Sequence, residues 1–191
     1  MINDGALDLA GDFSSVDLFS SARAEAGGTA TGAAISFTVD GGAVNVPSFS
    51  IESNGSGDFG GLLSYGEGGD ITVALRNGAS INASSNFSLH SSGTGGNGDA
   101  AGDGTGGVVL LSIANGSLTS PFVRLSSVGF AGNQFSGLPA RRYLLGSVSA
   151  SGTVRVGQGD SAPIRFNGTG TIFGSSVAIT SRNTLTYPRA N

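Results

Sequence analysis

The sequence has no cysteine, no tryptophan and no lysine, and its only histidine is His90. Without cysteine the chain forms no disulfide and no thiolate metal site, and one histidine alone does not make an ordinary zinc site. Charged residues make up only 12% of the chain, and the formal net charge is -4. All nine basic residues are arginines, and their largest cluster is Arg141-Arg142. Nucleic acid and anionic membranes are therefore not expected partners, because both require several cations on one face.

Long apolar runs and helix formers are also scarce. No run approaches the ~20 apolar residues that cross a bilayer, so no membrane insertion is expected, and no signal region follows Met1. The only stretch that favours a helix, Ser20 to Ala26, is interrupted by Gly27-Gly28. The 34 glycines accompany an apolar fraction of 38%, which is more than a solvated linker needs. We therefore expect an ordered all-β core with flexible glycine-rich edges.

What the sequence does contain is a repeat. Pairs of apolar residues separated by one polar residue recur, and their first members lie 33, 38, 36, 31 and 23 residues apart: Val16/Leu18, Phe49/Ile51, Phe87/Leu89, Val123/Leu125, Val154/Val156 and Val177/Ile179. Such alternation is typical of a strand with one buried face. A second short apolar phrase precedes most pairs, at Leu7-Asp8-Leu9, Val44-Asn45-Val46, Ile81-Asn82-Ala83 and Leu118-Thr119-Ser120. Turns that tolerate positive φ are expected at Gly41-Gly42, Asn77-Gly78, Asn115-Gly116 and Asn167-Gly168.

A strand pattern repeated at this spacing predicts stacked units, here an all-β parallel β-solenoid of about six coils with Gly-rich loops. We expect a single segment over 1–191, with regular coils over 1–127, an irregular insertion over 128–146 and final coils over 147–191. Residues Asn3 to Leu7 already match the turn and strand of a unit. This start inside a repeat predicts a fragment of a longer repetitive protein, or a subunit covered by neighbouring repeats, which associates end to end. The register also predicts that a charge at Leu89 is costly, whereas substitutions over 93–106 are tolerated.

Three phrases carry a resemblance: "GGTATGAAISFTVDGGAVNVPSFSIESNGSG", "ITVALRNGASINASSNFSLHSSGTGGNGDAAGDGTGG" and "VVLLSIANGSLTSPFVRLSSVG". They resemble the Gly-rich repeats of filamentous-haemagglutinin-like proteins and autotransporter passengers of Gram-negative bacteria. The resemblance covers residues 1 to 130 well and departs from the pattern at "NQFSGLPARRYLLG". It implies a right-handed parallel β-helix that acts as an adhesin shaft or secreted fibre outside the cell or on its surface. A host-surface or glycan ligand would be its partner, and no catalytic residue is carried over.

The chain contains a few residues that could serve in a catalytic site, namely one histidine and several acidic side chains. His90 is the only candidate base for a Ser/His/Asp site, and the register places it beside Glu52 in one outward column, where a surface pair is the simpler interpretation. Parallel β-helices also include polysaccharide lyases and glycosidases, which need two fixed acidic groups. The candidate carboxylates lie mostly in Gly-rich loops: Asp58, Glu67, Asp70, Asp99, Asp103 and Asp160. The aromatics expected to line a sugar groove are scattered: Phe59, Tyr65, Phe130, Phe135 and Tyr143. We therefore assign no catalytic residue and expect no enzyme.

The sequence contains one phrase that resembles a calcium-binding repeat and two arginines that its register places in one column. The phrase "GGNGD" at Gly95 to Asp99 resembles a nonapeptide calcium repeat, but its aspartate is displaced by one position and the motif does not recur. No cofactor is expected, and a weak surface calcium ion on the acidic loops remains an alternative. The register also places Arg124 and Arg155 in one outward column, one coil apart. We interpret these two arginines as solvated residues that discourage lateral aggregation of the sheets.

Overall fold

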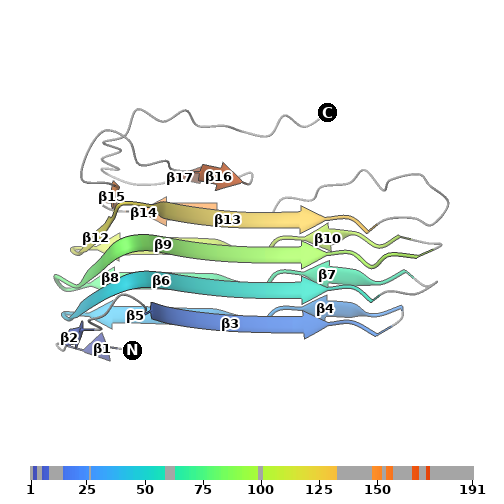
Figure 1. The fold of residues 1–191 in the computed structure, drawn as a ribbon, viewed down its shortest axis with the longest axis horizontal. Helices are drawn as coiled ribbons and strands as arrows, with labels where there is room; N and C mark the ends of the chain where they lie inside the picture. The colour runs from blue at the N-terminus through green and yellow to red at the C-terminus, as the bar shows by residue number, and fades with distance from the viewer. Residues whose placement is uncertain are drawn as a thin grey trace.

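The protein is a parallel β-solenoid (Figure 1). The computed structural model describes residues 2–3, 6–8, 15–25, 27–58, 63–98 and 101–132, together with four short strands between 148 and 172. The described residues contain no helix, and every strand pairing among them is parallel. The all-β class and the stacking of repeated units, both predicted from the alternating phrases, are confirmed.

Three sheets form the walls of the solenoid. The long sheet contains β2 (Ala6–Asp8), β3 (Ser15–Arg23), β6 (Ala43–Ser56), β9 (Ser80–Thr94), β12 (Ser117–Ser120), β13 (Val123–Phe130), β15 (Val154–Val156) and β16 (Arg165–Asn167). The short sheet contains β4 (Thr29–Thr31), β7 (Tyr65–Glu67) and β10 (Gly104–Thr105). The flat sheet contains β1 (Ile2–Asn3), β5 (Ile35–Asp40), β8 (Ile71–Arg76), β11 (Val109–Ala114), β14 (Val148–Ser151) and β17 (Thr171–Ile172).

Each coil passes through the long, short and flat sheets in that order. The best described coils are β3-β4-β5, β6-β7-β8 and β9-β10-β11, which stack on one another in Figure 1. These three coils are the ones described in all three sheets, whereas about six coils were expected over the whole chain. Asn77 and Asn115 adopt φ of 54° and 56° in the turns that lead from the flat sheet back to the long sheet. Asn167 of the expected Asn167-Gly168 turn is the last residue of β16 and pairs with Ser126, and Gly168 lies outside the described residues.

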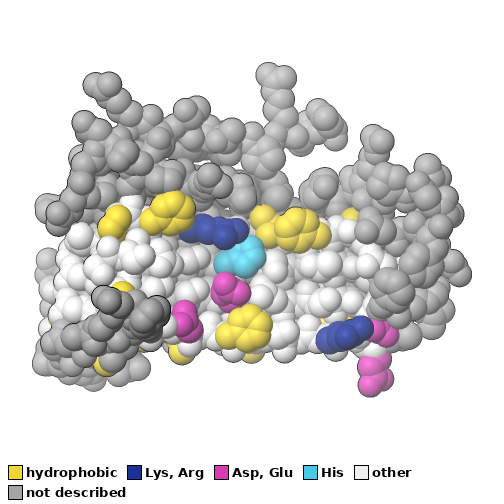
Figure 2. Space-filling view, viewed as in Figure 1, with side chains coloured by type: hydrophobic (Ala, Val, Ile, Leu, Met, Phe, Trp, Pro, Cys, Tyr) yellow, Lys and Arg dark blue, Asp and Glu magenta, His cyan; other side chains and the backbone are white. Residues whose placement is uncertain are grey.

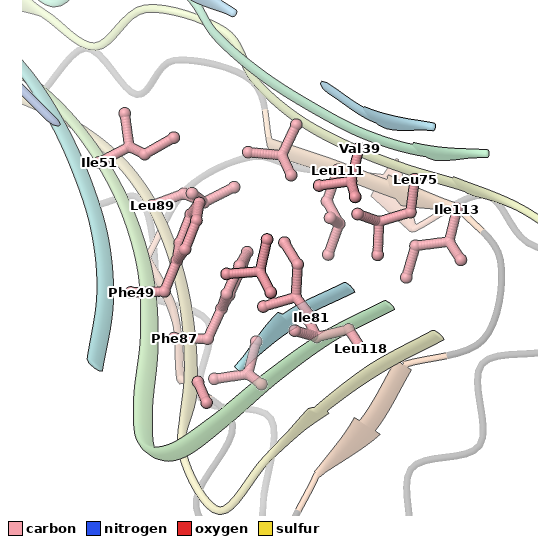
Figure 3. Packing of buried hydrophobic residues seen from close by; sticks show 14 of the residues in the cluster. Val39, Phe49, Ile51, Leu75, Ile81, Phe87, Leu89, Leu111, Ile113 and Leu118 are labelled. Atoms are coloured by element: carbon pink, nitrogen blue, oxygen red, sulfur yellow. The ribbon is translucent and has the colours of Figure 1, made fainter. Parts of the chain in front are cut away.

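The core contains apolar columns that run along the solenoid axis (Figure 3). The predicted pairs align in register: Val16, Phe49, Phe87 and Val123 form one column, and Leu18, Ile51, Leu89 and Leu125 form the next. The rings of Phe49 and Phe87 stack with centroids 5.1 Å apart and an interplanar angle of 11°. A register shift between Val46 and Ser48 bends β6, and Pro47 lies at this shift, where a strand tolerates a missing N–H.

Inward side chains become smaller along the three long strands β6, β9 and β13. In β9 the series is Phe87, Leu89, Ser91 and Gly93, and β6 and β13 follow the same order, ending at Gly55 and Gly129. The distance between opposing sheets must therefore decrease along the strand, because the side chains that separate them shrink. The cross-section is a wedge with an apolar wide end and a glycine thin end.

At the thin end the long and short sheets touch through their backbones. A Cβ added at Gly93 would overlap the carbonyl oxygens of Gly66 and Thr105, and one at Gly55 would overlap those of Glu67 and Ala30. The expectation that 93–106 is a tolerant loop is therefore wrong. This stretch includes the end of β9 and the strand β10, and its glycines permit a contact that no side chain would allow.

Serines mark the boundary between the apolar and glycine parts. Ser20, Ser53, Ser91 and Ser127 lie in one inward column, the serine ladder. Each of the last three donates to a turn carbonyl of the preceding coil: Ser53 Oγ to Ala33 O at 2.7 Å, Ser91 Oγ to Gly69 O at 2.9 Å and Ser127 Oγ to Gly107 O at 2.6 Å. The ladder thus connects each coil to the coil before it.

The predicted register fails after the fourth coil. Val154 and Val156 pair with Leu118 and Ser120 rather than following Val123 and Leu125. Arg155 consequently lies opposite Thr119, and Arg124 pairs with Arg165, so the predicted Arg124–Arg155 column is wrong. Residues 128–130, the first part of the expected insertion at 128–146, belong to β13, which ends at Phe130. Residues 133–147 and the pair Val177/Ile179 lie outside the described residues.

Candidate functional site

Four polar side chains and one aromatic ring lie together on the outer face of the long sheet. We call this cluster the His90 patch: Phe19, Glu52, His90, Arg124 and Ser126. Strand register places Phe19 beside Glu52, Glu52 beside His90, and His90 beside Ser126 on four neighbouring strands. Arg124 lies two residues before Ser126 and is therefore diagonal to His90. Figure 2 shows the histidine between an arginine and an acidic side chain, with a second acidic side chain nearby on the same face. The predicted Glu52–His90 neighbourhood is confirmed.

The electrostatic surroundings keep His90 neutral. Burial lowers the pKa of His90, the Arg124 guanidinium lowers it further, and Glu52 opposes both effects. Burial dominates because the charged imidazolium loses hydration under the neighbouring side chains. His90 Nδ1 is buried and has no hydrogen-bond partner. At neutral pH the ring is thus an uncharged, polar part of the patch.

The patch brings together a serine, a histidine and a carboxylate, but it does not form a nucleophilic triad. A triad requires hydrogen bonds from nucleophile to base and from base to acid. No hydrogen bond links Ser126, His90 and Glu52, and both Ser126 Oγ and His90 Nδ1 are unpaired. Ser126 is also only 1% exposed, so its hydroxyl is not presented to a substrate. The arrangement therefore lacks the hydrogen bonds of a triad, and it leaves Phe19 and Arg124 exposed on the outer face.

Three of the six candidate carboxylates have structural partners. Arg23 pairs with Asp58 at 2.9 Å, Thr31 Oγ1 donates to Glu67 at 3.1 Å, and the Val108 N–H donates to Asp70 Oδ1 at 2.9 Å. Glu67 and Asp70 line an open groove of about 490 Å³ where the short sheet meets the flat sheet. Asp99 and Asp160 lie outside the described residues. The groove therefore holds two carboxylates, and each of them accepts a hydrogen bond from an adjacent coil.

Of the five aromatic candidates, only Tyr65 and Phe130 lie among the described residues. Tyr65 and Phe130 are exposed on different strands, β7 and β13, while Phe59, Phe135 and Tyr143 lie outside the described residues. Sequence reasoning missed Phe19, the most exposed large apolar side chain of the described part at 67%. The signal was its outward position directly after Leu18, next to Glu52 in the following coil.

Two further findings concern metals and membranes. Among the described residues, no group of three or more His, Cys, Asp or Glu side chains could hold a metal ion. The part of the chain that the structure describes also has no helix that is long and apolar enough to span a membrane.

Parallel pairing in every sheet and a repeated coil define the chain as a β-solenoid repeat protein. Comparisons with protein-family models, with curated proteins and with solved structures found no match. The class of the protein is therefore established by its architecture.

The lowered pKa of His90 predicts a dependence of stability on pH. In the unfolded chain the pKa of histidine is about 6.5, which is higher than the pKa of His90 in the folded protein. The unfolded state therefore binds more protons than the folded state at acid pH. The contribution of neutral His90 to the free energy of unfolding is therefore fully present above the pKa of the unfolded chain. It decreases as the pH falls from that value towards the lower pKa of the folded protein. We expect urea denaturation of the wild type to show a larger loss of stability between pH 7.5 and pH 5.5 than His90→Gln shows. Equal losses in the two proteins would contradict this assignment.

Proposed function

We propose that the chain is a structural and adhesive segment of a secreted or surface-exposed bacterial repeat protein, resembling the shafts of filamentous-haemagglutinin-like adhesins. The main support is the inward series of large apolar residue, apolar residue, serine and small residue, which recurs in β3, β6, β9 and β13. Because each coil repeats the same contacts, the length of the shaft depends only on the number of coils.

The adhesive part of the proposal rests on the His90 patch. Phe19 offers an exposed aromatic face, and Glu52 beside it accepts hydrogen bonds from hydroxyl groups. Arg124 is exposed and suits a carboxylate, which guanidinium groups bind with two parallel hydrogen bonds. This combination fits an acidic glycan on a host or neighbouring cell surface. The solenoid would hold the patch on rigid strands, which position side chains better than loops do.

Retention on immobilised polysaccharides tests the proposal. We expect the chain to bind polygalacturonate in preference to dextran, and Phe19→Ala and Arg124→Gln each to weaken binding by roughly tenfold, about 1.4 kcal/mol. Ser21→Ala, an exposed change on the same strand as Phe19, is the matched control and should bind normally. Absence of retention on either polymer would refute the adhesive role. Release of shortened polymer that is lost in Glu52→Gln or Glu67→Gln would favour the carbohydrate-active alternative.

A further inference from the structure

The groove between the short sheet and the flat sheet crosses three successive coils, and all of its lining residues are described. Its volume is about 490 Å³. One wall is formed by three aligned side chains of β4, β7 and β10: Thr31, Glu67 and Thr105. The other wall is formed by the residues just before β5, β8 and β11: Ala34, Asp70 and Val108. Both walls are therefore files that run parallel to the solenoid axis.

Glycine backbone forms the floor of the groove. A Cβ added at Gly68 would overlap Ser91 Oγ of the serine ladder, so this position has no room for a side chain. The Gly68 N–H donates to Thr105 O of the next coil at 2.8 Å, and the Gly32 N–H donates to Glu67 O at 2.9 Å. The floor is thus free of side chains and is fixed by hydrogen bonds between coils.

Two carboxylates stand on opposite walls of the groove, both in its middle coil. One oxygen of each is held by an adjacent coil, because Thr31 Oγ1 donates to Glu67 Oε2 at 3.1 Å and the Val108 N–H donates to Asp70 Oδ1 at 2.9 Å. The other oxygens, Glu67 Oε1 and Asp70 Oδ2, have no partner among the described residues. Each carboxylate is therefore oriented by the fold and keeps one oxygen for a ligand donor.

The floor and walls match the two kinds of surface on an uncharged sugar ring. The faces of such a ring consist of C–H groups, which suit the glycine floor and the exposed Val108 side chain. Its edge carries hydroxyl donors, which suit carboxylate oxygens. Tyr65 adds an exposed aromatic ring on the outer face of β7, two residues before Glu67. An anionic polymer is disfavoured, because the groove is lined by two carboxylates and by no cation.

We propose that this groove binds a linear, uncharged glycan whose chain lies along the solenoid axis. Hydroxyl groups of one sugar donate to Glu67 and Asp70 in the middle coil, and the hydroxyls of Thr31 and Thr105 contact the sugars on either side. This inference goes beyond the proposed function, because the groove and the His90 patch lie on different sheets and take ligands of different charge. The fold holds the groove ready for its ligand, so little ordering is required on binding.

The variants Asp70→Asn and Glu67→Gln test the acceptor role without removing either side chain. The Val108 N–H still requires an acceptor, so the new amide at position 70 keeps its oxygen there and presents its NH₂ group to the groove. Glu25→Gln removes the same charge at an exposed position outside the groove and is the matched control. Circular dichroism verifies that each variant is folded. Should Asp70→Asn fail to fold, Glu67→Gln tests the same groove at an exposed side chain.

Titration calorimetry of the full chain with cellohexaose, an uncharged linear oligomer of glucose, measures the outcome. The wild type and Glu25→Gln should bind equally, whereas Asp70→Asn and Glu67→Gln should each bind roughly tenfold more weakly. Absence of binding by the wild type, or equal binding by all the variants, would overturn the inference. Binding of a glucosamine oligomer but not of cellohexaose would also overturn it, because negative charge alone explains that result.

The same measurements separate this inference from the proposed function. A chain that binds polygalacturonate but not cellohexaose would refute the glycan groove and leave the His90 patch intact. Binding of cellohexaose without retention on polygalacturonate would support the groove and refute only the adhesive role of the His90 patch.

Discussion

Gly93→Ala is expected to destabilise the protein by at least about 3 kcal/mol, although it adds a single methyl group. The added Cβ would overlap the carbonyl oxygens of Gly66 and Thr105, which belong to the facing short sheet. Backbone atoms cannot rotate away as a side chain can, so the two sheets must separate. Separation would break the contacts of neighbouring coils as well. Urea denaturation followed by far-ultraviolet circular dichroism measures the change.

Thr94→Ala is the matched control for this prediction. Thr94 follows Gly93 on β9 and its side chain is exposed, so its truncation should change stability by less than about 0.5 kcal/mol. Similar stabilities for the two variants would show that the sheets are not in backbone contact at the thin end, and that the stretch is the tolerant loop expected from composition alone.

Leu89→Asp is expected to cost at least about 4 kcal/mol. Leu89 is completely buried between Ile51 and Leu125 of the adjacent coils. The substitution removes apolar contacts and leaves a carboxylate without a partner in the core. Because Leu89 contacts residues of the coils on both sides, the substitution removes packing from three coils. We therefore expect the variant to accumulate as unfolded or insoluble chain. Solubility and circular dichroism at 25 °C provide the measurement.

Ser88→Asp places the same charge one residue earlier on the same strand. Ser88 faces outward and pairs with Arg124, so the new carboxylate lies in water beside a guanidinium. This variant should fold as the wild type does. If Ser88→Asp were as damaging as Leu89→Asp, the inward and outward faces of β9 would have been assigned incorrectly.

The apolar columns could be predicted from the sequence because period-two alternation is a local property. Phe49/Ile51 and Phe87/Leu89 identified the buried face, and the same register placed Glu52 beside His90. The register failed at Val154-Arg155-Val156 because each coil has two apolar phrases on either side of a bend, and both have the same pattern. Only the pairing with Leu118 shows to which phrase this segment belongs.

Glycine was the harder residue to interpret. A glycine-rich stretch is consistent with a mobile loop, and it is equally consistent with two backbones in contact. The difference lies in position, since Gly55, Gly93 and Gly129 each follow an inward serine by two residues. That spacing was present in the sequence, but its meaning depends on the short sheet opposite, whose buried residues at the contact are Ala30, Gly66 and Gly104.

The stacked rings of Phe49 and Phe87 have a consequence for the geometry of the exterior. The two rings lie nearly parallel, with an interplanar angle of 11°, and the strands that carry them keep one register from coil to coil. Outward side chains on successive strands then stand in straight files, at intervals of about 4.8 Å. A polymer laid along such a file meets one side chain per coil at a constant spacing, and the chemical group changes from coil to coil, as in the file Phe19, Glu52, His90 and Ser126.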